Sequence, residues 1–255
     1  MLEVSRKDVL YQDLMSFDDR RFIKLPIEGY MDLLGITPNT TQVAIINSIN
    51  NPKYRFVTAA VSRRQGKTYI ANVIGQLVCL VPGTNVLLMS PNYSLSQISF
   101  DLQRTLIKHF DLEVLRDNAK DKVIELSNNS TIRMGSVNQV DSVVGTSYDL
   151  IIFDEAALVD GRDAFNVALR PTLDKENSKA IFISTYRFKY IATASQTLFD
   201  SSDFNSRILS YTAGDIDVFL NGVRLDETDF TATNGTSVTL ASAADSNDEI
   251  VISAN

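Results

Sequence analysis

The stretch AAVSRRQGKTYIANVIG (residues 59–75) decides how this chain is interpreted. An apolar run ends in Gly66-Lys67-Thr68, and a helical pattern follows directly. In that setting the N–H groups of the loop and of the first helical turn can bind phosphate oxygens. Val61 stands where the phosphate-binding motif has its first glycine, so this stretch alone is equally typical of an ordinary strand-to-helix turn.

A second stretch, LIIFDE (150–155), favours the nucleotide interpretation. Four apolar residues are followed by Asp154 and Glu155, which places both carboxylates at the carboxyl end of a predicted strand. A nucleotide hydrolase needs such an aspartate to hold Mg²⁺, and an adjacent glutamate can act as general base toward water. Acidic residues here could also cap the next helix. The two motifs together predict Lys67 on the terminal phosphates and Thr68 on Mg²⁺.

Short apolar runs alternate with helical patterns between residues 55 and 185. Apolar runs bounded by turn residues predict buried strands, and apolar residues three to four apart predict helices. We expect strands at 55–61, 85–91, 148–158 and 179–185, helices at 67–81, 94–110 and 163–173, and a hairpin over 122–136. Strands that alternate with helices predict an α/β fold, with a mostly parallel sheet covered on both faces.

The pattern changes after about residue 190. Short alternating runs are broken by Asn221-Gly222 and Asn234-Gly235, which are strong hairpin signals. No helical periodicity is present in this part. We predict two domains, an α/β domain over residues 1–190 and a small acidic antiparallel β module over residues 191–255.

The composition excludes several classes of protein. Cys79 is the only cysteine, which rules out an internal disulfide framework and fits a reducing compartment. No apolar run approaches the roughly 18 residues of a membrane span, so we expect a soluble protein without a membrane partner. His109 is the only histidine, which leaves no Ser-His pair or histidine-rich metal site.

The negative charge is concentrated at the C-terminal end. The whole chain has a net charge of −7, whereas residues 192–255 alone carry 2 basic and 10 acidic side chains. The rest of the chain is therefore close to neutral. Because binding depends on local patches, the overall acidity does not argue against a nucleic-acid partner for the N-terminal part.

Three motifs together resemble the large terminase subunit of tailed bacteriophages, the ATPase motor that packages DNA into the prohead. They are SRRQGKT (62–68) before a helix, DLIIFDEAAL (149–158) and IFIST (181–185). The resemblance covers roughly residues 20–188. It implies a P-loop NTPase fold of the RecA/ASCE type that binds ATP and Mg²⁺ and hydrolyses ATP.

The resemblance also implies roles for individual residues. The family's phosphate loop commonly lacks the first glycine and carries an arginine that stabilises the γ-phosphate. Arg63, or its neighbour Arg64, matches this arginine. The nucleotide site would then comprise Gln42, Ser62, Arg64, Gln65, Gly66, Lys67 and Thr68, with Thr68 and Asp154 on the metal and Glu155 and Arg63 in catalysis.

Further matches are less specific. Gln42 stands where the family places a glutamine that recognises adenine, although a solvent-facing glutamine at a helix start fits nearly as well. Ser184-Thr185 resembles the family's coupling motif, which links hydrolysis to DNA movement, but these residues could also cap a helix. Val144 occupies a position where the family often has arginine, which puts a DNA or sensor role for that position in doubt.

The resemblance implies double-stranded DNA, the portal protein and the small terminase subunit as partners. It also implies a homo-oligomer on the portal, in the host-cell cytoplasm at the prohead. The family has a nuclease domain as well, and the roughly 65 residues after residue 190 are too few for one. That segment is instead similar to a β module of phage virion structural and tail-fibre-like proteins.

Two alternatives remain open. A superfamily-2 helicase also has an acidic box like Asp154-Glu155, but that class needs a second RecA-like domain with its own arginine motif. A non-catalytic phage structural or assembly protein could use the ATPase fold as a scaffold and the acidic β module as a contact surface.

Overall fold

The strands and helices group into two units, each with its own hydrophobic core. The structure, a computed structural model, describes residues 27–61, 65–156, 164–175, 177–185 and 187–254. The first unit runs to Ala59 and continues over Gln65–Ser184, and the second begins at Thr185 and also takes in Ala60 and Val61. No helix in these ranges is both long and apolar enough to span a bilayer.

The first unit is built on a seven-stranded sheet with the order β1-β7-β6-β2-β5-β4-β3. Strands β2, β5, β6 and β7 pair in parallel, and β3 and β4 extend the sheet in antiparallel fashion. The strands are β1 (Phe56–Ala60), β2 (Asn85–Ser90), β3 (Val114–Asn118), β4 (Val123–Leu126), β5 (Thr131–Ser136), β6 (Leu150–Asp154) and β7 (Lys179–Ser184). The helices are α2 (Ile27–Leu33), α3 (Thr40–Ile49), α4 (Lys67–Cys79) and α5 (Tyr93–His109), with short turns at η1 (Val137–Ser142), η3 (Ala164–Leu169) and η4 (Arg170–Thr172).

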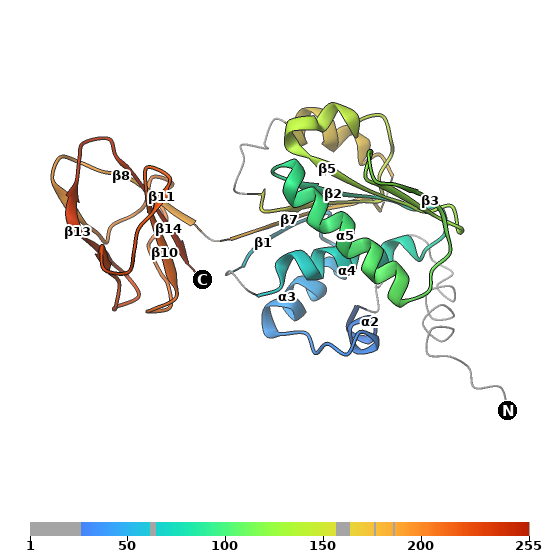
Figure 1. Ribbon diagram of the computed structural model, residues 1–255, viewed down its shortest axis with the longest axis horizontal. Coiled ribbons are helices and arrows are strands. Elements are labelled where there is room, and N and C mark those ends of the chain that lie inside the picture. Colours follow the sequence, from blue (N-terminus) through green and yellow to red (C-terminus); the bar gives the residue numbers. More distant parts are fainter. Residues whose placement is uncertain (1–26, 62–64, 157–163, 176, 186, 255) are drawn as a thin grey trace. The chain divides into compact units, whose positions relative to one another are not determined.

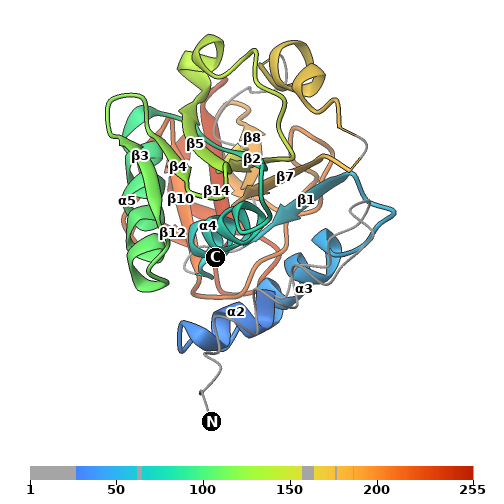
Figure 2. The same cartoon turned by 90° about the vertical axis from the view of Figure 1, so that its right-hand side faces the viewer.

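Both faces of this sheet are covered. Residues that alternate along a strand point to opposite faces, so neighbouring residues of one strand pack against different elements. Val86 and Leu88 face α4, where they approach Gly75. Leu87 and Met89 belong instead to a cluster with Phe153 and with residues of the short turns. Figure 1 shows α4 and α5 against the sheet, and Figure 2 shows α5 near β3 and β4 and α3 near β1. The predicted α/β fold with a mostly parallel, covered sheet is confirmed.

Helix α4 begins after a glycine with positive φ and is capped at its end by an asparagine side chain. Gly66 precedes it with a left-handed backbone, at a φ of +71°. At the other end the Asn128 side-chain amide donates to the carbonyl oxygens of Cys79 and Leu80, at 2.9 and 3.2 Å. These carbonyls lack partners within the helix, so Asn128 satisfies acceptors that would otherwise be unpaired.

Two predicted elements differ from those observed. The helix expected over 163–173 is, in its described part, a short π-helical turn at Ala164–Leu169 followed by a 3₁₀ turn at Arg170–Thr172. Pro171 explains the break, because proline has no N–H to donate and its ring collides with the preceding turn. The predicted hairpin is present as β4 and β5, with Asn129 at a φ of +64°, but β3 joins it as a strand that was not predicted.

The second unit consists of two small antiparallel sheets around one core. One sheet has the order β11-β10-β14-β8 and the other β12-β13-β9. Their strands are β8 (Arg187–Ile191), β9 (Gln196–Phe199), β10 (Ile216–Leu220), β11 (Val223–Arg224), β12 (Phe230–Thr231), β13 (Val238–Ala244) and β14 (Glu249–Ala254). The shared core includes Phe188, Phe199, Val218, Val238 and Ile252.

This unit begins earlier than the boundary predicted between residues 190 and 191. Strand β8 pairs with β14 along its whole length, so it belongs to the β unit although it lies before the predicted boundary. The hairpin predicted at Asn221-Gly222 joins β10 to β11, with both residues at positive φ. Asn234-Gly235 lies in the longer connection between β12 and β13.

Candidate nucleotide-binding site

The loop before α4 is arranged so that only glycine fits at its last position. Gly66 combines a φ of +71° with a close approach, because a Cβ there would lie 2.7 Å from Nε2 of Gln42. The first N–H groups of α4 have no partners within the helix and can bind an anion.

We expect Gly66→Ala both to destabilise the protein and to weaken nucleotide binding. Alanine at this φ costs about 1–2 kcal/mol, and its methyl group would also displace Gln42. Gly83→Ala is the matched control, since Gly83 has a φ of +73° but nothing within 4 Å of the added Cβ. Urea unfolding should show the larger loss for Gly66→Ala. Equal losses in both variants, with nucleotide binding retained, would contradict this role.

The two predicted motifs meet in space. The Thr68 hydroxyl donates to Oδ2 of Asp154 at 2.5 Å, although 86 residues separate them. The Lys67 ammonium lies 2.9 Å from Oε1 of Glu155. Lys67 and Glu155 are 7% and 21% exposed, so both charges are largely shielded from water. The structure thus brings Lys67, Thr68, Asp154 and Glu155 together as one polar cluster.

Glu155 is held in an unusual backbone conformation. Its φ is +54°, in the left-handed region that residues with a side chain rarely adopt. Its N–H donates to Oδ1 of Asp154 at 3.0 Å, which fixes the turn at the end of β6. Such strain costs about 1–3 kcal/mol and is concentrated at functional sites.

Burial raises the pKa of the Asp154 carboxyl above its ordinary value, and the neighbouring Glu155 adds to the increase. The hydrogen bond from Thr68 and the charge of Lys67 oppose it. Between the ordinary pKa of 3.8 and the raised one, the folded state holds more protons than the unfolded state. The contribution of Asp154 to stability therefore falls as the pH rises through this window and is unfavourable above it.

We expect Asp154→Asn to raise the thermal unfolding midpoint of the nucleotide-free protein at pH 7. The amide oxygen keeps the acceptor for Thr68, whereas the amide nitrogen cannot accept from the Glu155 N–H. We expect removal of the buried charge to outweigh this lost hydrogen bond, and each 1 kcal/mol gained corresponds to about 2–4 °C. The difference from the wild type should shrink as the pH is lowered through the raised pKa. Asp32→Asn, at an exposed position, is the control. An unchanged midpoint for Asp154→Asn would contradict the expectation.

Gln42 is buried beside the phosphate loop. Its Oε1 accepts a hydrogen bond from the Asn39 N–H at 3.0 Å, and its own N–H donates to Asn39 Oδ1 at 2.9 Å, which forms a capping box at the start of α3. Asn39 also donates to the carbonyl and side-chain oxygens of Gln65. The alternative of a solvent-facing Gln42 is wrong, because Gln42 is only 6% exposed. Adenine recognition by Gln42 stays a prediction.

Ser184 and Thr185 stand at the carboxyl end of β7. The sheet order places β7 between β1, which leads into the phosphate loop, and β6, which ends at Asp154. Thr185 is buried, and both residues make interactions within the protein. Their predicted coupling role stays a prediction.

The N-terminal part of the chain matches a known protein family. Residues 59–193, more than half of the chain, match the family described as terminase large subunit, T4likevirus-type, N-terminal. The chain belongs to the terminase large subunit family. The matched residues include the phosphate loop and both carboxylates at the end of β6, so the resemblance predicted from three motifs is confirmed. The resemblance of the C-terminal module to virion structural proteins stays a prediction.

Curated relatives are terminase large subunits of other phages. The subunit of Escherichia phage T5 is 55% identical over 188 residues, which cover 73% of this chain and 43% of that protein. The subunit of Thermus phage G20c is 27% identical over 184 residues, which cover 63% of this chain and 36% of that protein. This terminase chain spans less than half the length of these relatives.

Solved structures of large terminases share the fold. The large terminase ATPase domain of Thermus phage P74-26 has a TM-score of 0.53 and 24% identity, over 61% of this chain and 68% of that one. The large terminase of bacteriophage HK97 has a TM-score of 0.50 and 22% identity, over 69% of this chain and 37% of that one.

Three predicted site residues of this terminase chain, Ser62, Arg63 and Arg64, lie outside the described residues. The predicted roles of Arg63 and Arg64 at the γ-phosphate therefore stay predictions. Val144, at the position where the family often has arginine, is 44% exposed.

The sequence analysis missed a buried polar network behind the terminase site. Asn72 donates to the Thr68 carbonyl oxygen at 2.7 Å, and Gln103 of α5 donates to the Asn72 carbonyl oxygen, also at 2.7 Å. Farther along α4, Gln76 accepts a hydrogen bond from the hydroxyl of Tyr30. Thr68, Asn72 and Gln76 are spaced by four residues, so they share one face of the helix. This polar stripe in an otherwise apolar helix was the available signal.

Proposed function

We propose that this chain binds ATP with Mg²⁺ and hydrolyses it, as the ATPase part of a phage DNA-packaging motor. The observation that supports the proposal most directly is the joining of Thr68 to Asp154 and of Lys67 to Glu155, at 2.5 and 2.9 Å. It brings the phosphate loop and the acidic residues into one site at the carboxyl ends of the parallel strands, where α/β proteins bind ligands.

The residues present fit a magnesium ion. Mg²⁺ prefers oxygen ligands and is commonly held by one or two carboxylates together with substrate phosphates. The Thr68 hydroxyl and the Asp154 carboxylate supply such oxygens next to the helix N-terminus. When bound, Mg²⁺ would neutralise charge that develops on the phosphates.

Each site residue has a proposed task. Lys67 and the N–H groups of Gln65, Gly66 and the start of α4 bind the phosphates, with Ser62 and Arg64 completing the loop. Gln42 contacts the adenine. Glu155 accepts a proton from the attacking water, and Arg63 stabilises the charge of the transferred phosphoryl group.

The partners follow from membership of the family. We propose that the motor acts on double-stranded DNA, with the portal protein and the small terminase subunit, as an oligomer at the prohead in the host cytoplasm. Ser184 and Thr185, between the strands that carry the two motifs, would link hydrolysis to DNA movement.

Isothermal titration with ATP tests the proposal on the full chain. We expect binding with Mg²⁺ present, and weaker binding when EDTA removes the metal. Phosphate release from ATP should then be measurable only when Mg²⁺ is present. If ATP does not bind under either condition, the proposal fails, and a non-catalytic assembly protein built on an ATPase fold becomes the better interpretation.

A further inference from the structure

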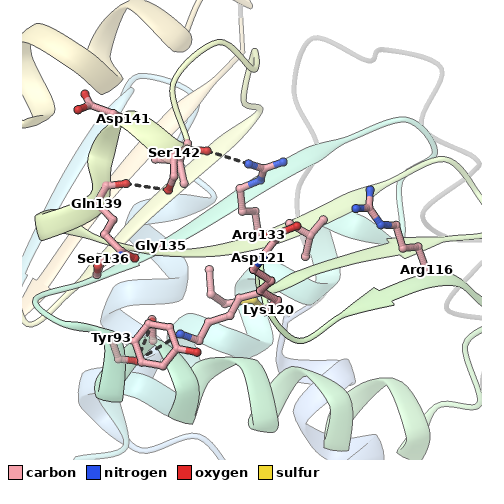
Figure 3. A pocket seen from close by; sticks show the side chains of 15 residues that line it. Tyr93, Arg116, Lys120, Asp121, Arg133, Gly135, Ser136, Gln139, Asp141 and Ser142 are labelled. Carbon is pink, nitrogen blue, oxygen red and sulfur yellow. Dashed lines mark hydrogen bonds between the residues drawn. The ribbon is translucent and has the colours of Figure 1, made fainter.

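A second polar site lies on the same unit, away from the phosphate loop. It is a pocket of about 520 Å³ between the start of α5, the β3–β4 hairpin, the end of β5 and η1. We call it the basic pocket, because four cations line it: Arg116, Lys120, Lys122 and Arg133. Figure 3 shows Arg133 and Arg116 on one side of the pocket and Ser136 and Gln139 on another.

Lys122 is the unusual residue of the basic pocket. The residue is only 3% exposed. The ammonium lies 2.8 Å from the centre of the Tyr93 ring and 3.5 Å from the Tyr93 carbonyl oxygen, which is the limit of a hydrogen bond. Within the described residues no carboxylate pairs with it. A buried charge is costly unless it is paired, so this ammonium has unused capacity for an anion.

The four cations of the pocket outnumber its two carboxylates, Asp121 and Asp141. Arg133 uses one nitrogen on the Ser142 carbonyl oxygen, at 3.0 Å, and a guanidinium has further donors to offer. The Arg116 charge is already balanced by Glu125, at 3.0 Å. Of the two carboxylates that line the pocket, Asp121 accepts a hydrogen bond from Asn118. Among the described residues, Lys120, Lys122 and Arg133 are therefore the lining cations without a carboxylate partner; Lys120 is exposed, and Lys122 is the buried one.

The position of the basic pocket sets it apart from the nucleotide site. It lies at the carboxyl end of β5, whose last residues line it and which pairs in parallel with β2 up to Ser136 and Ser90. Strand β2 separates β5 from β6, which carries Asp154. Two strand spacings amount to about 10 Å, so the two sites share one edge of the sheet without sharing residues.

We propose that the basic pocket is a second phosphate-binding site, in which Lys122 and Arg133 bind the oxygens of a phosphate ester. Ammonium and guanidinium donors are the groups that proteins use for phosphate. The volume suits a ligand of nucleotide size. A nucleotide free in solution and a phosphate of a nucleic-acid backbone offer the same chemistry to these residues, and the experiment separates the two sources.

The test uses the full chain with Lys67→Ala, so that the phosphate loop does not dominate binding. One arm titrates ADP in the presence of EDTA, and the other titrates a short fluorescent DNA duplex at several salt concentrations. We expect at least one probe to bind, and adding Lys122→Met to weaken that binding about tenfold or more. If the duplex binds, Lys122→Met should also reduce the slope of affinity against salt by about one.

Two further variants make the result decisive. Lys108→Met removes an exposed lysine of α5 outside the pocket, and it should leave binding of the same probe unchanged. Arg133→Gln should weaken binding as Lys122→Met does, and it tests the site even if Lys122→Met does not fold. The proposal is overturned if no probe binds, or if Lys122→Met and Arg133→Gln bind as the Lys67→Ala protein does. Both outcomes are independent of Mg-ATP binding by the wild type.

Discussion

Replacing Glu155 by glutamine is expected to abolish ATP turnover while ATP binding persists. A positioned general base contributes about 10²- to 10⁴-fold to a rate, and glutamine cannot accept the proton of the attacking water. The amide has the same length and keeps the turn at the end of β6. The loss should therefore appear in the rate of phosphate release and not in the folded structure.

The same substitution should tighten ATP binding. In the nucleotide-free protein the Lys67 ammonium is paired with Glu155 at 2.9 Å, so bound phosphate must compete with this carboxylate. Removing the negative charge frees Lys67. Because the pair is partly shielded, we expect a gain of up to about tenfold in affinity, or ~1.4 kcal/mol.

Glu113→Gln is the matched control, since Glu113 is exposed and far along the chain from the site. It should leave both turnover and binding unchanged. Isothermal titration and phosphate release, measured on the same preparations, give the two quantities. Turnover that survives in Glu155→Gln at the wild-type rate would remove Glu155 from the mechanism.

Lys67→Ala is expected to lower ATP affinity about 10- to 100-fold. A hydrogen bond to a charged group contributes about 1.5–3 kcal/mol, and in the proposed function Lys67 makes such a bond to the phosphates. The stability of the protein should also fall, because Glu155 is only 21% exposed and loses its partner. Thermal unfolding checks the second expectation, and isothermal titration with Mg-ATP checks the first.

The matched control is Lys53→Ala, at an exposed position before β1. It removes one positive charge from the same unit, so it measures the effect of net charge alone. An equal loss of affinity in both variants would show that general electrostatic attraction, and not a phosphate contact, explains the result. Together with Glu155→Gln, these variants separate binding from hydrolysis.

Much of the first unit was predictable from local patterns. The strand and helix around the phosphate loop follow from an apolar run, a glycine and a helical periodicity, and β1 and α4 agree with the expectation within two residues. The paired carboxylates at the end of β6 were predicted because polar residues directly follow a buried strand. Such signals are read correctly from sequence because each depends on neighbours only a few residues away.

Features that depend on distant neighbours were not predicted. The capping box of α3 involves Gln42, whose burial beside Gly66 depends on residues 24 positions apart. Strand β8 belongs to the β unit because β14 lies beside it, some 60 residues further on. The ammonium of Lys122 is buried because α5 supplies Tyr93, and no local pattern indicates that packing.

The sequence by itself determined which groups this terminase chain carries and the local conformations they need. Gly66, Asn221 and Gly222 adopt positive φ, a conformation that glycine and asparagine tolerate better than other residues. Only the tertiary structure decided that β7 lies between β1 and β6, and that Asp154 reaches Thr68 across 86 residues. The reason is physical: the order of strands in a sheet is set by how the helices and turns cover its faces, and no single segment contains that information.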